Sequence, residues 1–215
     1  MFDGAHGEVM GLADASVITE VRTGAVSGVA TDLLARKDAH HLAVIGAGAQ
    51  GRSHLAAMME VRDIQKVTVY DQIREAAKKY QKEMEEKYKI PVMVCDSVEE
   101  AVKGAEIICT VTPSKEPYLK AEWITPGAHI NAVGAFTPNT REIESSLMAK
   151  AKLDADQVEA MKKECGEYLI PKNEGLFGEE HITGSIGGIL AGQGPGRENA
   201  TGLTLFEALG LAGED

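Results

Sequence analysis

The pattern of hydrophobic and polar positions predicts a chain in which helices and short strands alternate. Residues 16–34 hold few helix breakers and repeat apolar side chains every three or four positions, as an α-helix does. The run LAVI at 42–45 is short and predicts a buried strand, and the amphipathic spacing over 49–61 predicts a helix directly after it. Similar β-rich runs predict further strands at 67–70, 92–94, 106–111 and 129–133.

Charged segments supply the remaining elements of this alternation. Residues 73–88 are helix-like and heavily charged, and Ser97 followed by Glu100 is a capping box, which starts another helix. Strands that alternate with helices form βαβ units, and right-handed crossovers place the helices on both faces of a parallel sheet. The predicted fold class is therefore α/β, a Rossmann-like, doubly wound parallel sheet.

The pattern is weaker in the last third of the chain. After Leu153 the periodicity loosens, and residues 191–199 are rich in glycine and proline, which is typical of a loop. The final stretch LTLFEALGLAGED, residues 203–215, is predicted as a helix that ends abruptly.

Composition and charge restrict the partners. The chain has 215 residues, 44% of them hydrophobic, which suits a domain with a well-filled core. A net charge of −11 repels phosphate backbones, so nucleic acid is not an expected partner. No apolar stretch reaches the ~20 residues of a membrane span, and the three cysteines form neither a CxxC zinc motif nor a disulfide framework. We expect a cytoplasmic protein that binds neither a membrane nor a metal.

Gly46, Gly48 and Gly51 form a GxGxxG motif in the setting that dinucleotide-binding proteins use, after a strand and at the start of a helix. Gly46 permits the tight turn, Gly48 lets the backbone approach a pyrophosphate, and Gly51 lets the helix pack closely on the strand. Ala49 and Gln50 begin the helix, whose N-terminal amides suit an anionic phosphate. The alternative is a tight strand-to-helix turn that holds no ligand.

Asp71 ends the next strand about 20 positions after Gly51, where an acidic side chain binds the ribose hydroxyls of NAD. A 2′-phosphate would be repelled there, so NAD is the expected cofactor and NADP the less favoured one. Arg74 follows three residues later and would soften this preference if it faced the phosphate.

Further candidates follow the next two strands. Thr112 and Ser114 come after the strand 106–111, and Val133 and Gly134 end the strand at 129–133. These positions lie at the carboxyl edge of the sheet, where such folds bind ligands, and we expect them to line the cofactor cleft. Ordinary turn chemistry explains the same residue types nearly as well.

Arg22 is the candidate on the first helix. A guanidinium can hold a carboxylate through two parallel hydrogen bonds, although an arginine at a helix surface is the more ordinary interpretation. Gly24 and Gly28 follow with small neighbours, which predicts close packing against this part of the helix.

Taken together, these segments resemble the ornithine cyclodeaminase/mu-crystallin family. ITEVRTGAVSGVATDLLA, LAVIGAGAQGRSHL, the strand ending in YD, INAVGAFTPNTREI, ECGEYLIP, PGREN and TLFEALGLA occur in the family's order. The resemblance implies an NAD(P)-binding domain beside a separate substrate and dimerisation domain. It also implies hydride transfer between nicotinamide and the nitrogen-bearing carbon of a small amino or imino acid, with Arg22 holding the substrate carboxylate in a homodimer.

Two departures from the family pattern matter. A long region that supplies most of the family's substrate domain, including a substrate lysine, precedes the equivalent of FDGAHGE and is absent from this sequence. We therefore expect residues 1–36 to be a remnant of that domain with its linking helix, 37–195 the NAD-binding domain, and 196–215 the start of a return helix. The second departure is Phe136, where cyclodeaminases and the related alanine dehydrogenases carry an aspartate; a phenyl ring cannot transfer a proton.

The sequence thus predicts an NAD-dependent oxidoreductase of the ketimine reductase or amino acid dehydrogenase type, with no identified general acid or base. Two alternatives stay open. One is an ornithine cyclodeaminase, and the other is a non-catalytic NAD-binding protein that lacks its substrate domain.

Overall fold

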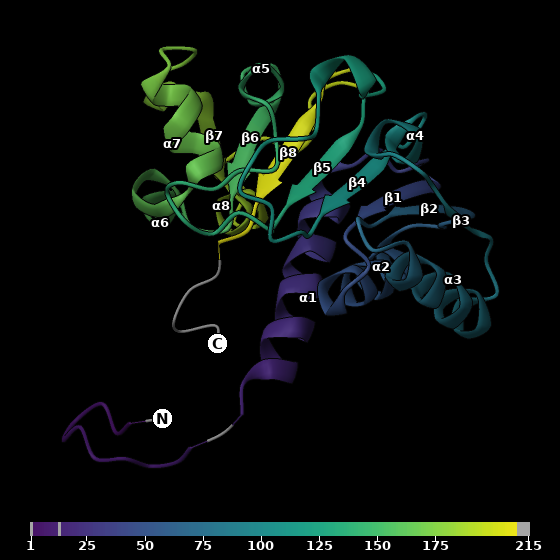
Figure 1. Ribbon diagram of the computed structural model, residues 1–215. Helices are drawn as coiled ribbons and strands as arrows, with labels where there is room; N and C mark the ends of the chain where they lie inside the picture. Colours follow the sequence, from purple (N-terminus) through teal and green to yellow (C-terminus); the bar gives the residue numbers. More distant parts are fainter. Residues whose placement is uncertain (1, 13, 210–215) are drawn as a thin grey trace.

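One parallel sheet forms the centre of the molecule (Figure 1). The structure, a computed structural model, describes residues 2–12 and 14–209. Its sheet has eight strands in the order β3-β2-β1-β4-β5-β8-β6-β7, and every neighbouring pair is parallel. The strands are β1 His41–Ile45, β2 Lys66–Tyr70, β3 Val92–Val94, β4 Ile107–Thr110, β5 His129–Ala132, β6 Lys152–Ala155, β7 Ile182–Ser185 and β8 Thr204–Glu207.

Helices cover both faces of this sheet, as the predicted α/β class requires. The helices are α1 Ser16–Leu34, α2 Ala49–Val61, α3 Arg74–Tyr88, α4 Val98–Val102, α5 Ser145–Met148, α6 Val158–Glu164, α7 Gly166–Asn173 and α8 Ile186–Leu190. Single 3-10 turns occur at Ala121–Trp123 and Glu179–His181. The apolar residues of α1, α2, α3 and α8 pack on one face, and those of α4, α5, α6 and α7 pack on the other.

The elements predicted between residues 16 and 133 are confirmed to within one residue at each end. The predicted cap at Ser97 is also present, with the bond to the Glu100 side chain coming from the residue before the N-cap. Ser97 Oγ accepts the backbone N–H of Glu100 at 3.1 Å, while Glu100 Oε2 accepts the N–H of Asp96 at 2.7 Å.

The prediction of a helix over residues 203–215 is wrong for residues 203–209, the part of this segment that the structure describes. Thr204–Glu207 is strand β8, which lies inside the sheet between β5 and β6, so the segment 196–215 contributes a central strand. Leu205 packs into the core on one face and Phe206 into the core on the other, so both faces of the strand are buried. Such a strand has no polar alternation that would separate it from a buried helix. Residues 210–215 lie outside the described residues. Strands β6 and β7 were likewise not predicted.

Helix α1 is held to the sheet by its second half. Gly24 and Gly28 face α2, where an added Cβ would lie 2.8 Å from Ser53 O and 3.2 Å from Ala57 Cβ, so the predicted close packing is confirmed. The buried guanidinium of Arg62 donates to the carbonyl oxygens of Thr31, Ala35 and Arg36 and so satisfies the C-terminal end of α1.

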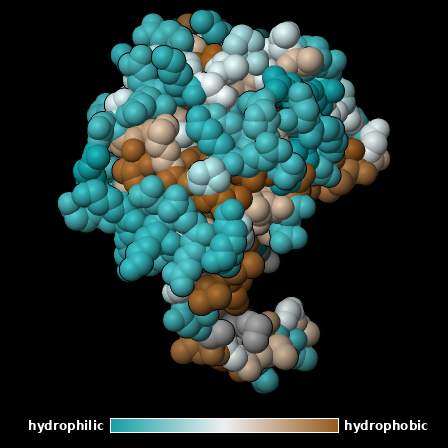
Figure 2. All heavy atoms as spheres, turned by 90° about the vertical axis from the view of Figure 1, so that its right-hand side faces the viewer, coloured by the Kyte–Doolittle hydropathy of each residue, from teal (hydrophilic) through white to brown (hydrophobic). Residues whose placement is uncertain are grey.

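The first half of α1 projects away from the sheet (Figure 1). Val17, Ile18 and Val21 are exposed there, at 69%, 47% and 60% of their surface. Figure 2 shows hydrophobic side chains along this projecting part of the molecule, below the main body. The helix therefore carries an unburied apolar surface in addition to the residues that anchor it.

Candidate cofactor and substrate site

The three glycines of the turn between β1 and α2, here called the glycine turn, differ in how much space surrounds their Cβ positions. Gly46 has a φ of +110°, and a Cβ there would lie 2.7 Å from Val111 O, so the turn and the approach of the β4 loop both require glycine. A Cβ on Gly51 would lie 2.3 Å from Gly46 O, which shows how closely the helix packs on the turn. At Gly48 no atom of the described residues, apart from its own neighbours in the chain, lies within 4 Å of the Cβ position, so this side of the turn is open among residues 2–12 and 14–209.

The N-terminus of α2 is open in the same way. Gly48 is its N-cap, no side chain among the described residues caps the helix, and its first turn, from Ala49, carries no acidic residue. Arg52 donates to the carbonyl oxygens of Ala47 and Gly48 and pairs with Glu83 of α3 at 2.6 Å, which fixes the turn from the α3 side. The uncapped amide groups and the positive end of the helix dipole form an anion-binding feature.

Asp71 lies at the end of β2 beside this turn. Its Oδ2 accepts the backbone N–H of Ala47 and its Oδ1 accepts that of Ile73, both at 2.8 Å, so the carboxylate is fixed in place. Each carboxylate oxygen has a further lone pair for another donor. Arg74 forms an ion pair with Asp96, and both side chains are more than half exposed.

A cavity of about 490 Å³ opens beside the glycine turn, between the ends of β4 and β5 and helix α1. Its lining residues are Thr19, Arg22, Thr23, Gln50, Val111, Thr112, Pro113, Val133, Gly134, Phe136, Ala208 and Leu209. The lining contains one charged side chain, that of Arg22, several hydroxyl and amide groups, and a set of apolar residues. Ligand sites in proteins have this composition, a largely apolar wall with few polar groups.

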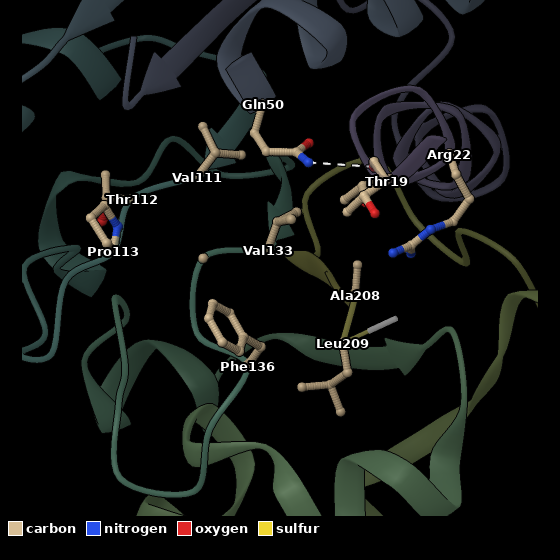
Figure 3. A pocket seen from close by; sticks show the side chains of 12 residues that line it. Thr19, Arg22, Gln50, Val111, Thr112, Pro113, Val133, Phe136, Ala208 and Leu209 are labelled. Carbon is tan, nitrogen blue, oxygen red and sulfur yellow. Dashed lines mark hydrogen bonds between the residues drawn. The ribbon is translucent and has the colours of Figure 1, made fainter. Parts of the chain in front are cut away.

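Figure 3 shows how the cavity is divided. The guanidinium of Arg22 points from α1 into the space, and the ring of Phe136 enters it from the loop after β5. Gln50 spans toward α1, where its Nε2 donates to Thr19 O at 3.5 Å. The cavity therefore presents a cation on one side and an apolar wall of Phe136 and Leu209 on another.

A buried carboxylate lies behind the cavity wall. Glu142 Oε1 accepts three hydrogen bonds, from Thr112 N at 2.8 Å and from Thr112 Oγ1 and Tyr118 OH at 2.6 Å each. Its Oε2 accepts the N–H of Gly134 at 2.9 Å. A Cβ on Gly134 would lie 2.6 Å from Glu142 Oε2 and 2.1 Å from Thr112 O, so packing within the protein itself requires this glycine.

Two more buried carboxyl groups lie near Glu142. Glu167 of α7 accepts the backbone N–H of Glu142 at 2.5 Å, and Glu207 ends β8. Burial raises the pKa of Glu167 to about 8; the hydrogen bond from the backbone N–H of Glu142 opposes this rise, and the negative charge of the Glu142 side chain adds to it. Burial also raises the pKa of Glu142, against hydrogen bonds from Thr112 and Tyr118 that lower it, and raises the pKa of Glu207 well above its usual range.

Comparison with known proteins identifies the family. The chain matches the Ornithine cyclodeaminase/mu-crystallin family over residues 1–215. The protein belongs to this family.

Several family members of known activity are similar to the chain over almost its whole length. It is 40% identical to the Delta(1)-pyrroline-2-carboxylate reductase of Bacillus cereus over 207 residues, 96% of this chain and 63% of that protein. It is also 40% identical to the ketimine reductase mu-crystallin of Mus musculus over 215 residues, 100% of this chain and 64% of that protein. The chain thus spans less than two thirds of the length of these relatives.

Solved structures of family members share the fold. The Delta(1)-pyrroline-2-carboxylate reductase of Thermococcus litoralis, in complex with NADH and L-proline, has a TM-score of 0.95 and 42% identity and covers 99% of this chain and 66% of its own. An archaeal alanine dehydrogenase dimer with bound NAD has a TM-score of 0.92 and 36% identity, covering 99% and 65%.

The structure brings many of the predicted site residues of this family member together. Arg22, Gln50, Thr112, Val133 and Gly134 all line the cavity. Gly46, Gly48, Ala49, Gly51 and Asp71 lie at the adjoining turn. Ser114 lies outside the lining, and its Oγ donates to Glu116 O at 2.8 Å, which is turn chemistry.

Sequence reasoning missed several residues of the site, among them Thr19, Ala208, Leu209 and Glu142. Thr19 lies three residues before Arg22 on α1, a helical spacing that could have indicated it. Ala208 and Leu209 follow β8, which was predicted as a helix. Glu142 carries no local signal, because its partners come from loops up to 30 residues away.

Two kinds of feature are absent from the described residues. No helix among residues 2–12 and 14–209 is long and apolar enough to cross a membrane. Within the same ranges, no three His, Cys, Asp or Glu side chains are placed to hold a metal ion.

Proposed function

We propose that the chain binds NAD(H) across the glycine turn and the adjoining cavity. The open side of Gly48 leaves room for a pyrophosphate, and the uncapped N-terminus of α2, at Ala49 and Gln50, offers amide donors to it. Thr112, Val133 and Gly134 form the cavity wall on the side of β4 and β5, where the nicotinamide half would lie. The residues present therefore fit the cofactor that relatives hold.

The same proposal favours NAD over NADP. Asp71 is fixed by Ala47 and Ile73 with lone pairs left for ribose hydroxyls, and its charge opposes a 2′-phosphate. Arg74 is engaged with Asp96 of the loop after β3, which supports the preference for NAD.

The substrate we propose is a small cyclic imino acid with a carboxylate beside the C=N bond. The observation that carries this proposal is one cavity in which Arg22 faces Phe136 and Leu209. A guanidinium suits the carboxylate, and the apolar wall suits the hydrocarbon part of the ring. The relatives named as pyrroline-carboxylate and ketimine reductases support the same substrate class.

The chain's own residues would orient and enclose this substrate. When bound, NADH supplies a hydride to an electrophilic carbon. Arg22 holds the carboxylate, while Phe136, Val133 and Leu209 exclude water from the reacting carbon. None of the described residues in the cavity lining is a carboxylic acid or a histidine, so an imine that arrives already protonated suits this site best.

The two alternatives predict different products. An ornithine cyclodeaminase moves protons at two nitrogen atoms, and the apolar Phe136 in the cavity disfavours that chemistry. A non-catalytic NAD-binding protein would bind the cofactor and convert nothing.

The test is an assay in which purified protein is mixed with NADH and a five- or six-membered cyclic imino acid. The reaction is measured as the loss of NADH absorbance. We expect reduction of the cyclic imine and no proline from ornithine with NAD. Cofactor binding without any turnover would favour the non-catalytic alternative, and proline from ornithine would favour the cyclodeaminase. Phe136→Asp is the companion variant, because it restores a proton carrier at an exposed position; it should raise proline formation with NADH affinity unchanged.

We also propose that the chain forms a homodimer. Exposed apolar side chains on the projecting part of α1 favour association, and a related alanine dehydrogenase is a dimer. A monomer by light scattering at high concentration would refute this. The three buried free cysteines support a reducing, cytoplasmic location.

A further inference from the structure

Glu142 joins the two loops that form the floor of the cavity. Thr112 belongs to the loop after β4, and Gly134 begins the loop after β5. One carboxylate accepts the backbone N–H of each, at 2.8 and 2.9 Å. No part of the sheet ladder makes these two contacts, since β4 ends at Thr110 and β5 at Ala132.

Glu142 is itself held firmly. Its backbone N–H is accepted by Glu167, and its carbonyl oxygen accepts the N–H groups of Tyr118 and Leu119 at 2.8 and 2.9 Å. The side chain has no exposed surface. The carboxylate therefore acts as a fixed point to which the two loops are attached.

The contact from Gly134 to Glu142 also closes the base of the loop that carries Phe136. Residues 134–142 leave β5 and return to the same carboxylate, and Phe136 extends from this closed loop with 65% of its surface exposed. The position of the ring in the cavity thus depends on the attachment at the base.

We propose that Glu142 is a positioning residue for the nicotinamide half of the cofactor and for the Phe136 loop. The proposal rests on the proposed function, because it assigns that half to the cavity floor. Glu142 does not line the cavity, so its effect passes through Thr112 and Gly134. Asp71, at the adenosine half, accepts its hydrogen bonds from Ala47 and Ile73, while Glu142 accepts from Thr112, Tyr118 and Gly134, so we expect binding of the adenosine half to depend on Glu142 much less.

The substitution Glu142→Gln separates positioning from general packing. Each carboxylate oxygen receives one backbone N–H, from Thr112 or from Gly134. A glutamine of the same shape must turn its NH₂ group toward one of them, where two donors face each other, so one attachment is lost. The matched control is Glu106→Gln, because Glu106 accepts the N–H of His40 at 2.8 Å at the opposite edge of the sheet.

The experiment measures calorimetric affinities for NADH and for ADP-ribose, which lacks the nicotinamide, together with thermal unfolding. In Glu142→Gln we expect the affinity for NADH to fall about tenfold or more, because a charge-assisted tether is lost, and the affinity for ADP-ribose to stay within about twofold. Glu106→Gln should leave the ratio of the two affinities at the wild-type value, whatever its effect on the melting temperature.

Tyr118→Phe is the second variant, should Glu142→Gln fail to fold. Tyr118 lies outside the cavity lining, and the change removes its 2.6 Å hydrogen bond to Glu142. We expect the affinity for NADH to fall a few-fold and the affinity for ADP-ribose to stay unchanged. An unchanged ratio in the folded variants, or an equal loss for both ligands, would overturn the positioning role and leave the proposed function intact. If the wild-type protein bound ADP-ribose and not NADH, both the positioning role of Glu142 and the proposed function would be overturned.

Discussion

Gly48→Ala should separate cofactor binding from stability. The backbone at Gly48 has φ −80° and ψ −161°, which alanine adopts without strain. In the part of the chain that the structure describes, no atom beyond the neighbouring residues lies within 4 Å of the new methyl group. The methyl group would project into the open space that we assign to the pyrophosphate. We expect the affinity for NADH to fall at least about tenfold, which corresponds to about 1.4 kcal/mol.

The effect of this change on folding is the sum of two small opposing contributions. Replacing glycine removes about 0.4–1 kcal/mol of unfolded-state entropy, while alanine is a poorer N-cap by roughly the same amount. The melting temperature should therefore move by no more than about 2–4 °C.

Gly51→Ala is the companion variant with the opposite expectation. Its methyl group would lie 2.3 Å from Gly46 O and 3.2 Å from Val44 Cγ1, so the helix must move away from the strand. Overpacking of this kind costs about 1–3 kcal/mol, which lowers the melting temperature by roughly 3–10 °C for a chain of this size.

Calorimetry with NADH and thermal unfolding monitored by circular dichroism measure both quantities on both variants. Wild-type affinity for NADH in Gly48→Ala would refute the assignment of the pyrophosphate to the open side of the turn. An unchanged melting temperature in Gly51→Ala would refute the close helix–strand contact.

Three further predictions concern single side chains. Asp71→Asn should narrow a preference for NAD over NADP that we expect to be tenfold or more, and equal affinities in the wild type would contradict the role of Asp71. Arg22→Lys should raise the KM for a cyclic imino acid about tenfold or more through loss of the bidentate contact, with NADH affinity unchanged; an unchanged KM would contradict it. The pKa of Glu167 is raised to about 8 by burial, so the folded state holds a proton that the unfolded state releases above its pKa of 4.5. The free energy of unfolding should therefore fall by up to about 1.4 kcal/mol per pH unit between about pH 5 and 8, and urea titrations should show a smaller slope for Glu167→Gln; an equal slope would contradict the assignment.

The part of the fold that the sequence predicted well has clear periodicity. The helix 16–34 repeats apolar residues at helical spacing, and each early strand is a short apolar run next to a turn or a helix cap. Strand β8 lacks such a signal, because Leu205 and Phe206 are buried on opposite faces and the ionisable Glu207 is fully buried. The burial of an ionisable residue follows from its tertiary neighbours, which no local window contains.

The candidate site likewise has one half that the sequence indicates and one half that it does not. The cofactor half depends on a single βαβ unit, in which Gly46, Gly48, Gly51 and Asp71 have fixed spacing, so one sequence indicates it. The substrate half joins Arg22 on α1, Phe136 after β5 and Leu209 after β8. These residues meet only through the order of strands in the sheet, and so their proximity could not be predicted from spacing.

The loop after β5 has a constrained base and an exposed tip, and under the proposed function this arrangement lets substrate preference vary while the cofactor site stays constant. Its base is constrained, since Gly134 has no space for a side chain and Glu142 uses both carboxylate oxygens. Phe136 is 65% exposed and makes no contact that the base requires, so a substitution there should cost little stability. Under the proposed function, the residue at position 136 can therefore change its chemistry without moving Thr112 or Gly134. We expect proton-transfer capacity at this position to be a property of one exposed side chain and to be separable from cofactor affinity, which we assign to Glu142 and the glycine turn.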